Sequence, residues 1–512
     1  MSNSGKRTAM PRKLCVHLAA LASVAAPVLG GDFVPPSPDK PWYPPRLHDY
    51  EQELAHRGVA ERPSGRPVAI DPEKVYGLPE LIDIAERSHP ETRIAWESAR
   101  QAAAAVGLSQ STYYPYLVAS AAAGYEGAFI PFPTSTQGPG PSEVSVTGGN
   151  TLATDAWGER AVVGLKWLLF DFGERKAATT IAKEGLMMAN VGLNAVHQQI
   201  VFNVTRRFYE LKTARQKVAV AESSVRAADT VAHAVQERLE NGLATRPEVL
   251  QAEQQSAQAA FELEAARGAL SDAQVAFVES LGILSTTQLH VAKVADNPPS
   301  ETIADSLDEL INRALPQRPD LVAKFANVRA RRAGVRKARA AYYPRISLDA
   351  HAGWAELDVS IKDSPYFGGN DLVYHAGIAI DFPIFDGFAR RKKLLIAESE
   401  LRAAEDELAH SRDSVIREVW KARTDFETSL RKQEFAAKLV GAAESAFAAS
   451  LDAFRHGLGT YVDVAIAQRN VAASRSVIVD TRSAIHTSAA ALALRVGDLA
   501  RPAPASQSLR QQ

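Results

Sequence analysis

The sequence predicts an α+β membrane fold made of two similar halves, each with a pair of β-strands and one long helical hairpin. The duplication is visible because the Tyr-Tyr-Pro at positions 113–115 returns at 342–344, and because the copies stay 215 positions apart from Phe170 onward. In each copy, alternating apolar residues precede a long proline-free stretch with a seven-residue apolar repeat. The duplicated unit is much longer than a solenoid repeat, so we interpret each copy as one half of a duplicated fold.

The duplication and the composition together divide the chain into five segments. We predict a signal peptide at 1–25, a proline-rich N-terminal arm at 26–72, a first structural repeat at 73–295, a second at 296–498 and a disordered tail at 499–512. The many prolines of the second segment indicate an extended arm over the surface.

The N-terminus has the pattern of a Sec-type signal peptide. Basic residues precede an apolar run from Leu14 to Val24, and small residues permit cleavage after Ala25. Cys15 is the sole cysteine and lies inside that apolar run. We therefore expect an exported chain without a disulfide and without a lipid anchor.

The composition argues against several other functions. With 46% hydrophobic residues, 23% charged residues and a formal net charge of -1, the chain is globular in class and unsuited to binding nucleic acid. No run beyond the N-terminus is apolar for the roughly 18 residues that a transmembrane helix needs. Motifs for metal binding, phosphate loops and nucleophile elbows are also missing from the sequence, so we predict no enzyme, cofactor or metal site.

Each half begins with a helix and continues as two strands. The first half predicts one helix from about Leu78 to Gln110, then strands near 117–125 and 157–169, joined by a Gly/Pro-rich loop at 127–155. In the second half the corresponding strands lie near 346–354 and 374–382, with a loop at 355–371.

The two faces of these strands differ in character. The polar residues oppose an apolar face on which Trp157 and Trp167 are ten positions apart, or roughly 33 Å of strand at about 3.3 Å per residue. When tilted, such a strand spans roughly the 25 Å apolar band of an outer-membrane barrel. Alternation alone also occurs in soluble sandwiches, but aromatic residues near both rims favour the membrane. The lipid-facing girdle is predicted at Trp157, Trp167, Tyr374 and Phe382, and the lumen at Arg160, Lys166, His351, His375 and Asp381.

Four strands are too few to close a barrel, because single-chain barrels begin at about eight strands. The strands must therefore be pooled between chains. The long helix predicted from about Gly173 to Asn241 would reach roughly 100 Å at 1.5 Å per residue. Turns at Gly242 and Gly457 would reverse the chain into a second helix of each hairpin.

This twofold order of helix, Tyr-Pro, strand, loop, strand, Phe-Asp, long helix and Gly-Leu-x-Thr turn resembles the TolC family over about residues 72–498. The resemblance implies a homotrimer in which each chain lends four strands to a shared twelve-stranded transmembrane β-barrel, continued by a long periplasmic α-helical barrel. It also implies a passive outer-membrane exit duct for small toxic compounds. The implied partners are a periplasmic adaptor, an inner-membrane pump of RND, ABC or MFS type and outer-membrane lipid.

By the same resemblance, the hairpin tips contact the adaptor and close the pore. The departures from TolC lie in the second tip, where Gly459 replaces a basic residue, Ile466 an acid and Phe454 a tyrosine, so we expect a closed state held more by apolar packing. Asp463 would supply a ring of three carboxylates, and its alternative role is a helix-start acid. The implied adaptor contacts are Gly242, Leu243, Thr245, Gly457, Leu458 and Thr460, and the implied gate is Phe454, Gly459, Asp463 and Ile466.

Two other functions remain open from the sequence. Within the same family, the cargo could be a polypeptide, as in a type I protein-secretion channel. From another class, a soluble periplasmic coiled-coil scaffold would share the long helices but would have no use for Trp157 and Trp167 on one apolar face. Metal export is a further variant that no run of Met or His supports.

Overall fold

A computed structural model describes residue 52 and residues 70–71, 73–137, 144–283, 289–292, 306–361 and 367–499. Of residues 128–137, 144–153, 361 and 367 it describes the backbone alone. The described residues fall almost entirely in one compact unit, Pro67–Gln512. The predicted signal peptide, most of the predicted arm and the tail beyond residue 499 lie outside them.

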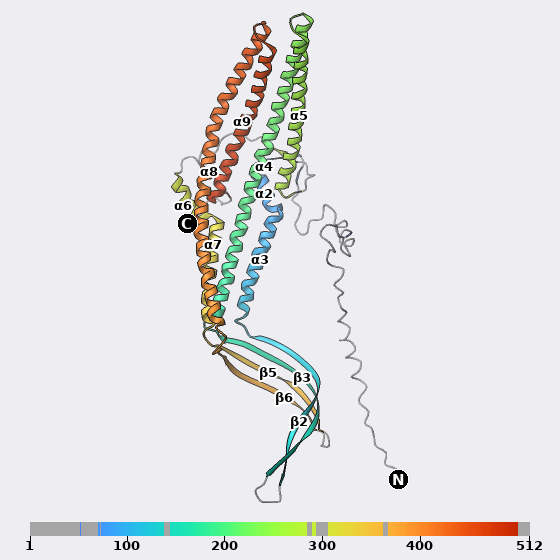
Figure 1. The fold of residues 1–512 in the computed structure, drawn as a ribbon, viewed down its shortest axis with the longest axis vertical. Helices are drawn as coiled ribbons and strands as arrows, with labels where there is room; N and C mark the ends of the chain where they lie inside the picture. Colours follow the sequence, from blue (N-terminus) through green and yellow to red (C-terminus); the bar gives the residue numbers. More distant parts are fainter. Residues whose placement is uncertain are drawn as a thin grey trace, which may run out of the picture. The chain divides into compact units, whose positions relative to one another are not determined.

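Both halves follow the same order of elements (Figure 1). The first half contains β1 (Val75–Tyr76), α2 (Leu78–Ser88), α3 (Pro90–Ser111), β2 (Tyr116–Gln137), β3 (Val144–Phe170), α4 (Glu174–Glu240), α5 (Arg246–Ser280) and β4 (His290–Val291), of which β1 and β4 pair in parallel. The second half contains α6 (Leu307–Gln317), α7 (Pro319–Ala340), β5 (Arg345–Ile361), β6 (Phe367–Asp381), α8 (Ala389–Arg455) and α9 (Tyr461–Val496).

The single helix predicted from Leu78 to Gln110 is wrong, because the chain bends at His89. His89 is extended, with φ -67° and ψ 131°, and Pro90 begins α3. Proline has no N–H for the helix ladder and its ring disfavours a helical conformation in the preceding residue. Gly282 packs against this bend so closely that a Cβ atom would lie 2.6 Å from the Cα of His89.

The four long strands form one antiparallel sheet in the order β2-β3-β5-β6. The loops predicted at 127–155 and 355–371 are mostly strand, because backbone pairing continues from Tyr125↔Trp157 out to Gln137↔Val144. Glycine and proline suggested loops there, but β2 is an edge strand of the described sheet, where proline is tolerated. The register shifts once, between Pro133 and Ser135.

Helix α4 of the first half and helix α8 of the second are each 67 residues long, as the sequence predicts. They pack against α5 and α9, respectively. The turns between α4 and α5 and between α8 and α9 lie at the end of the unit away from the sheet (Figure 1). Two apolar clusters pack the halves near the helix bends, around Phe208 in the first and Phe426 in the second. Within the described residues, no helix combines the length and the apolar character needed to cross a bilayer.

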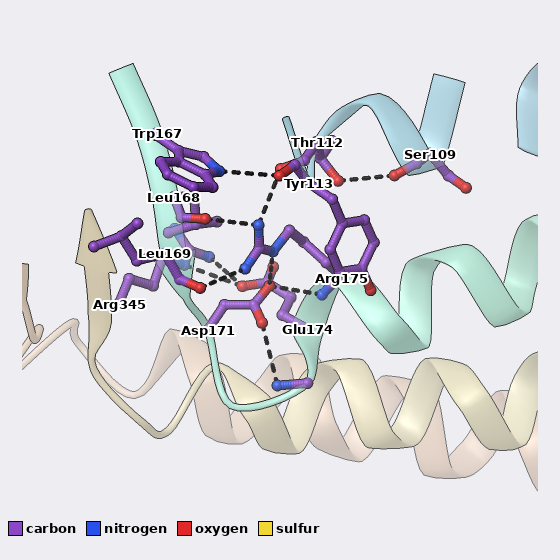
Figure 2. A network of polar contacts seen from close by, with 11 residues as sticks. Ser109, Thr112, Tyr113, Trp167, Leu168, Leu169, Asp171, Glu174, Arg175 and Arg345 are labelled. Carbon is purple, nitrogen blue, oxygen red and sulfur yellow. Dashed lines mark hydrogen bonds and ion pairs between the residues drawn. The ribbon is translucent and has the colours of Figure 1, made fainter. Parts of the chain in front are cut away.

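A polar network joins the sheet to the helices where β3 gives way to α4 (Figure 2). The backbone turns through two left-handed residues, Phe172 (φ 51°) and Gly173 (φ 93°). The Asp171 carboxylate accepts hydrogen bonds from the backbone N–H of Gly173 and of Arg175, at 3.2 and 2.7 Å. The Arg175 guanidinium, also paired with Asp171, donates to three carbonyl oxygens, those of Thr112, Leu168 and Leu169.

The second half repeats this junction with fewer contacts. Asp386 accepts from the backbone and side chain of Arg390, whose guanidinium donates to the carbonyl oxygen of Ile384 at 3.4 Å. Here Gly387 and Phe388 are the two left-handed residues, so glycine and phenylalanine have exchanged places.

We predict that Arg175→Ala destabilises the protein by roughly 3 kcal/mol, because it leaves the buried Asp171 carboxylate unpaired. The matched change Arg390→Ala removes a more exposed pair with one carbonyl contact and is expected to cost about 1 kcal/mol. Thermal unfolding of the two variants in detergent measures the difference. Equal shifts in melting temperature would contradict the unequal weight assigned to the two junctions.

Candidate channel gate and barrel surface

Both hairpin turns end their first helix in the same hydrogen-bond pattern. At the first turn, Gly242 N–H donates to the carbonyl oxygen of Leu239 and Leu243 N–H to that of Arg238. At the second, Gly457 and Leu458 repeat these bonds to Phe454 and Ala453. This is the Schellman cap, and it requires the left-handed φ of 71° and 75° that glycine adopts readily.

The residue after each glycine points into solvent. In a Schellman cap this position often packs back on its own helix. Here the side chains of Leu243 and Leu458 remain 66% and 85% exposed. Exposed leucines at two equivalent tips are suited to a contact with another protein, in agreement with the implied adaptor contact.

The second helix of each hairpin begins with a capping box. The Thr460 hydroxyl and N–H donate to the Asp463 carboxylate at 2.7 and 3.1 Å, and Asp463 N–H donates back to the hydroxyl at 3.3 Å. Thr245 donates to Glu248 in the same way, at 2.6 Å from its N–H and 3.0 Å from its hydroxyl. Sequence analysis missed Glu248, although the constant spacing of the repeats makes it the counterpart of Asp463.

These contacts favour the ionised form of Asp463. The hydrogen bond from the Thr460 hydroxyl, followed by that from the Thr460 backbone, lowers the pKa of the Asp463 carboxyl below its ordinary value. The helix-start role is therefore present in the structure. It leaves the carboxylate exposed, so the same group remains available to a cation.

The two hairpin tips pack against each other through Phe454, one of the predicted gate residues. Phe454 is 4% exposed, and the Arg238 guanidinium of the other hairpin lies 4.6 Å from its ring and donates to its carbonyl oxygen at 2.6 Å. The Tyr461 hydroxyl donates to the carbonyl oxygen of Gln251 at 3.2 Å. The buried cluster at the tips comprises Val231, Val235, Val249, Ala252, Phe454, Tyr461, Val464 and Ala465.

The remaining two gate candidates lie close by in the second tip. A Cβ atom at Gly459 would come 3.3 Å from that of Ala453, so a basic side chain here would have to displace its neighbour. Ile466 is 45% exposed. Neither the sequence nor the repeat pattern indicated the contact of Arg238 with Phe454, because it joins residues 216 positions apart.

The sheet separates the predicted girdle from the predicted lumen. Strand register aligns Val163, Ala352 and Tyr374 across one face, which also holds Trp157 and Trp167 of β3. Tyr374 is 78% exposed in the single chain, and the Trp167 indole N–H donates to the carbonyl oxygen of Tyr113 at 2.9 Å. Phe382, also exposed, directly follows β6.

The opposite face carries the polar candidates. Gly164, His351 and His375 are register partners, and the two imidazole rings stack with centroids 5.4 Å apart. Lys166 lies opposite Asp349. Arg160 and Asp381 lie at alternate positions on the same face as Lys166 and His375, respectively. Among the described residues, no group of three or more His, Cys, Asp or Glu side chains could hold a metal ion.

Known proteins resemble this chain along most of its length. A sequence model described as outer membrane efflux protein matches residues 81–283 and 310–498. Protein CyaE of Bordetella pertussis is 28% identical over 83% of this chain and 84% of its own length. Outer membrane efflux protein BepC of Brucella suis is 24% identical over 65% of this chain and 71% of its own length.

The fold is also found in a solved structure. A crystal structure of CusC covers 86% of this chain and 99% of the CusC chain with a TM-score of 0.69 and 19% identity. Since the family match covers both repeats, the chain belongs to the outer membrane efflux protein family. Its fold is that of the outer-membrane channels of this family, which confirms the fold class that the sequence predicts.

We predict that Arg238→Ala loosens the contact between the two tips by about 2 kcal/mol, because it removes charge-assisted bonds to the carbonyl oxygens of Phe454 and Leu243. Arg238→Lys keeps the charge but not the planar fork, and is expected to recover only part of the contact. Arg455 is exposed in the same turn as Phe454, so Arg455→Ala is the matched control. Single-channel conductance in planar bilayers measures the effect, and the Arg238→Ala channel should open more often than the control. Equal open times would contradict the role of the contact between Arg238 and Phe454 in keeping the tips closed.

Proposed function

We propose that the chain is the outer-membrane exit duct of a tripartite efflux system, which passively conducts small toxic compounds delivered by an inner-membrane pump through a periplasmic adaptor. Membership of the outer membrane efflux protein family supports this function. The observation that carries the channel architecture is the open sheet. It has four strands, one apolar exposed face, and two edge strands, β2 and β6, that each pair with a single strand in the described sheet.

An open sheet of this kind must be completed by other chains. Unpaired strand edges cannot be left in hydrocarbon, where no water is present to satisfy the backbone. Three copies would supply twelve strands, which is within the range of known barrels. The helical part needs neighbours as well, since Phe261 of α5 and Trp420 and Phe435 of α8 are 71%, 60% and 64% exposed.

In this trimer the polar sheet face would line a water-filled lumen. Its charges are mixed in sign, since Arg160, Lys166, Asp349 and Asp381 share this face and Lys166 lies opposite Asp349. This mixture suits a broad duct better than a selective filter. The tips at Gly242 and Gly457 would form the opposite opening, where the exposed leucines meet the adaptor. Asp463 would then place three carboxylates around the narrowest point.

The efflux function is tested by deleting the gene from its host. The deletion strain should become more susceptible to small toxic compounds, and the wild-type chain should restore resistance. Comparing the proteins secreted by the two strains tests polypeptide export as the alternative cargo. If a secreted polypeptide were lost while susceptibility stayed unchanged, the chain would be a protein-secretion channel instead.

The gate is tested by the conductance of the detergent-purified protein with and without Asp463→Asn. A small conductance blocked by divalent cations should lose its block in the variant. Because the hydrogen bonds from Thr460 lower the pKa of the Asp463 carboxyl, the carboxylate stays ionised to a more acid pH than an ordinary aspartate does. The block should therefore persist from pH 7 down to about pH 5 and fade only below the ordinary titration range of aspartate. A block that disappears near pH 6 would mean that Asp463 is not the group that binds the cation.

The same preparation reports the assembly. Its mass in detergent should equal that of three chains. For the conductance test of Asp463→Asn, the matched control is Glu248→Gln, because Glu248 occupies the equivalent capping box of the other hairpin. Loss of the cation block in Asp463→Asn but not in Glu248→Gln would place the constriction at the second tip. Equal loss in both variants would place it across both tips.

A further inference from the structure

An open pocket of about 500 Å³ lies between the end of α3 and the first turns of α4. It is adjacent to the junction of Figure 2, since Tyr113 contributes to both. Its lining consists of two tyrosines, two threonines, two lysines and a glutamine, with no carboxylate. Every one of these side chains can donate a hydrogen bond.

No acidic side chain of the described residues neutralises the positive charge of this pocket. Lys176 and Lys183 lie on one face of α4, seven residues apart, and neither forms an ion pair in the described ranges. The acids of the neighbouring turns are engaged elsewhere. Asp171 pairs with Arg175, Glu174 with Arg345 at 2.8 Å and Glu184 with Arg329 at 2.9 Å.

A buried hydroxyl group in the lining also lacks a partner. Thr179 is 8% exposed, and its Oγ1 atom makes no hydrogen bond within the structure. Buried polar groups are nearly always hydrogen-bonded, and an exception calls for an explanation such as a bound ligand. Thr179 lines the pocket together with the two unpaired lysines, so a group bound between the lysines would lie next to this residue.

The second repeat provides an internal comparison. The positions of Thr179 and Thr180 are occupied there by Leu394 and Leu395, and that of Lys183 by Glu398. Glu398 pairs with Arg339, the counterpart of Gln110, at 3.3 Å. The second copy keeps a basic residue, Arg391, at the position of Lys176. It has leucines and an internal ion pair where the first copy has Thr179, Thr180 and Lys183, which means that the shared architecture alone does not create the pocket.

We propose that this pocket binds a phosphate-bearing group, and that its position favours the headgroup of a phospholipid over a free phosphate ion. Several donors around two ammonium groups match a tetrahedral oxyanion, and lysine is a common phosphate ligand. The pocket lies beside the end of β3, and in the proposed barrel, on which this step rests, strands that span the outer membrane would end near the lipid headgroups. Basic side chains at that depth attract anionic lipid. The inference concerns lipid binding and does not depend on which cargo the channel exports.

The experiment uses the full chain, purified in detergent and freed of lipid. Native mass spectrometry counts the phosphatidylglycerol and phosphatidylethanolamine molecules that bind when each lipid is added back, with diacylglycerol as the probe that lacks phosphate. Calorimetric titration with inorganic phosphate in phospholipid-free detergent tests the free ion. The variants are Lys176→Gln with Lys183→Gln, and Thr179→Val, which replaces the unpartnered hydroxyl by a methyl group and should leave the fold intact.

The matched control is Lys392→Gln with Lys393→Gln. These two exposed lysines begin α8 at the corresponding junction of the second repeat, so the control removes the same charge at the same end of the helices. The double change at Lys176 and Lys183 should weaken phospholipid binding at least about tenfold, the effect of losing one charge-assisted bond. Thr179→Val should weaken it less, and the control should bind as the wild type does.

The outcomes separate the two sources of phosphate. Saturable binding of inorganic phosphate that the lysine variant loses, without any difference in bound phospholipid, would assign the pocket to the free ion. If the lysine variant binds both probes as the wild type does, the proposal is wrong. It is also wrong if the control loses as much binding as the lysine variant, because the effect would then be one of general charge.

Discussion

The contact between Asp171 and Arg175 is the constraint on which the arrangement of sheet and helices depends. At this point the chain must change from strand to helix, and the carbonyl groups of both elements lose their regular partners. Arg175 supplies donors to the last residues of β3 and of α3, while Asp171 caps the start of α4. One ion pair, 12% and 7% exposed, therefore sets the direction in which a helix of 67 residues leaves the sheet.

Much of this fold could be predicted because the chain contains it twice. The long helices and their turns recur at a constant spacing after Phe170, and the two strands recur in the same order before it, so each half tests the interpretation of the other. Prediction failed where local signals compete with pairing. Glycine and proline beyond Tyr125 indicated a loop, but the strands satisfy their backbone across the hairpin for many more residues, and the sequence does not encode that pairing locally.

The candidate site could be predicted only in part from the sequence. The tips could be found because the Schellman glycines and capping threonines are local features of the chain. The contacts of Arg238 with Phe454 and of Tyr461 with Gln251 could not, because they join residues more than 200 positions apart and depend on how the two hairpins pack. Asp463 shows why one residue can have two interpretations: its carboxylate caps its own helix with one oxygen and remains exposed to solvent.

The differences between the two halves indicate where the function is specific. Duplicated helices around a shared pore have nearly equivalent surroundings, so the cores of both copies are filled by similar residues, as the equivalent Val204 and Val419 illustrate. The copies diverge at the junction with the sheet. Arg175 holds three carbonyl groups where Arg390 holds one. Among the described residues, Lys183 and the Thr179 hydroxyl have no partner, whereas the second copy has an ion-paired glutamate and a leucine at these positions. A basic residue, Lys176 or Arg391, is present in both copies. Because equivalent architecture would tolerate equal side chains at both junctions, this divergence reflects a requirement of the first junction alone, and contact with a phosphate group satisfies it.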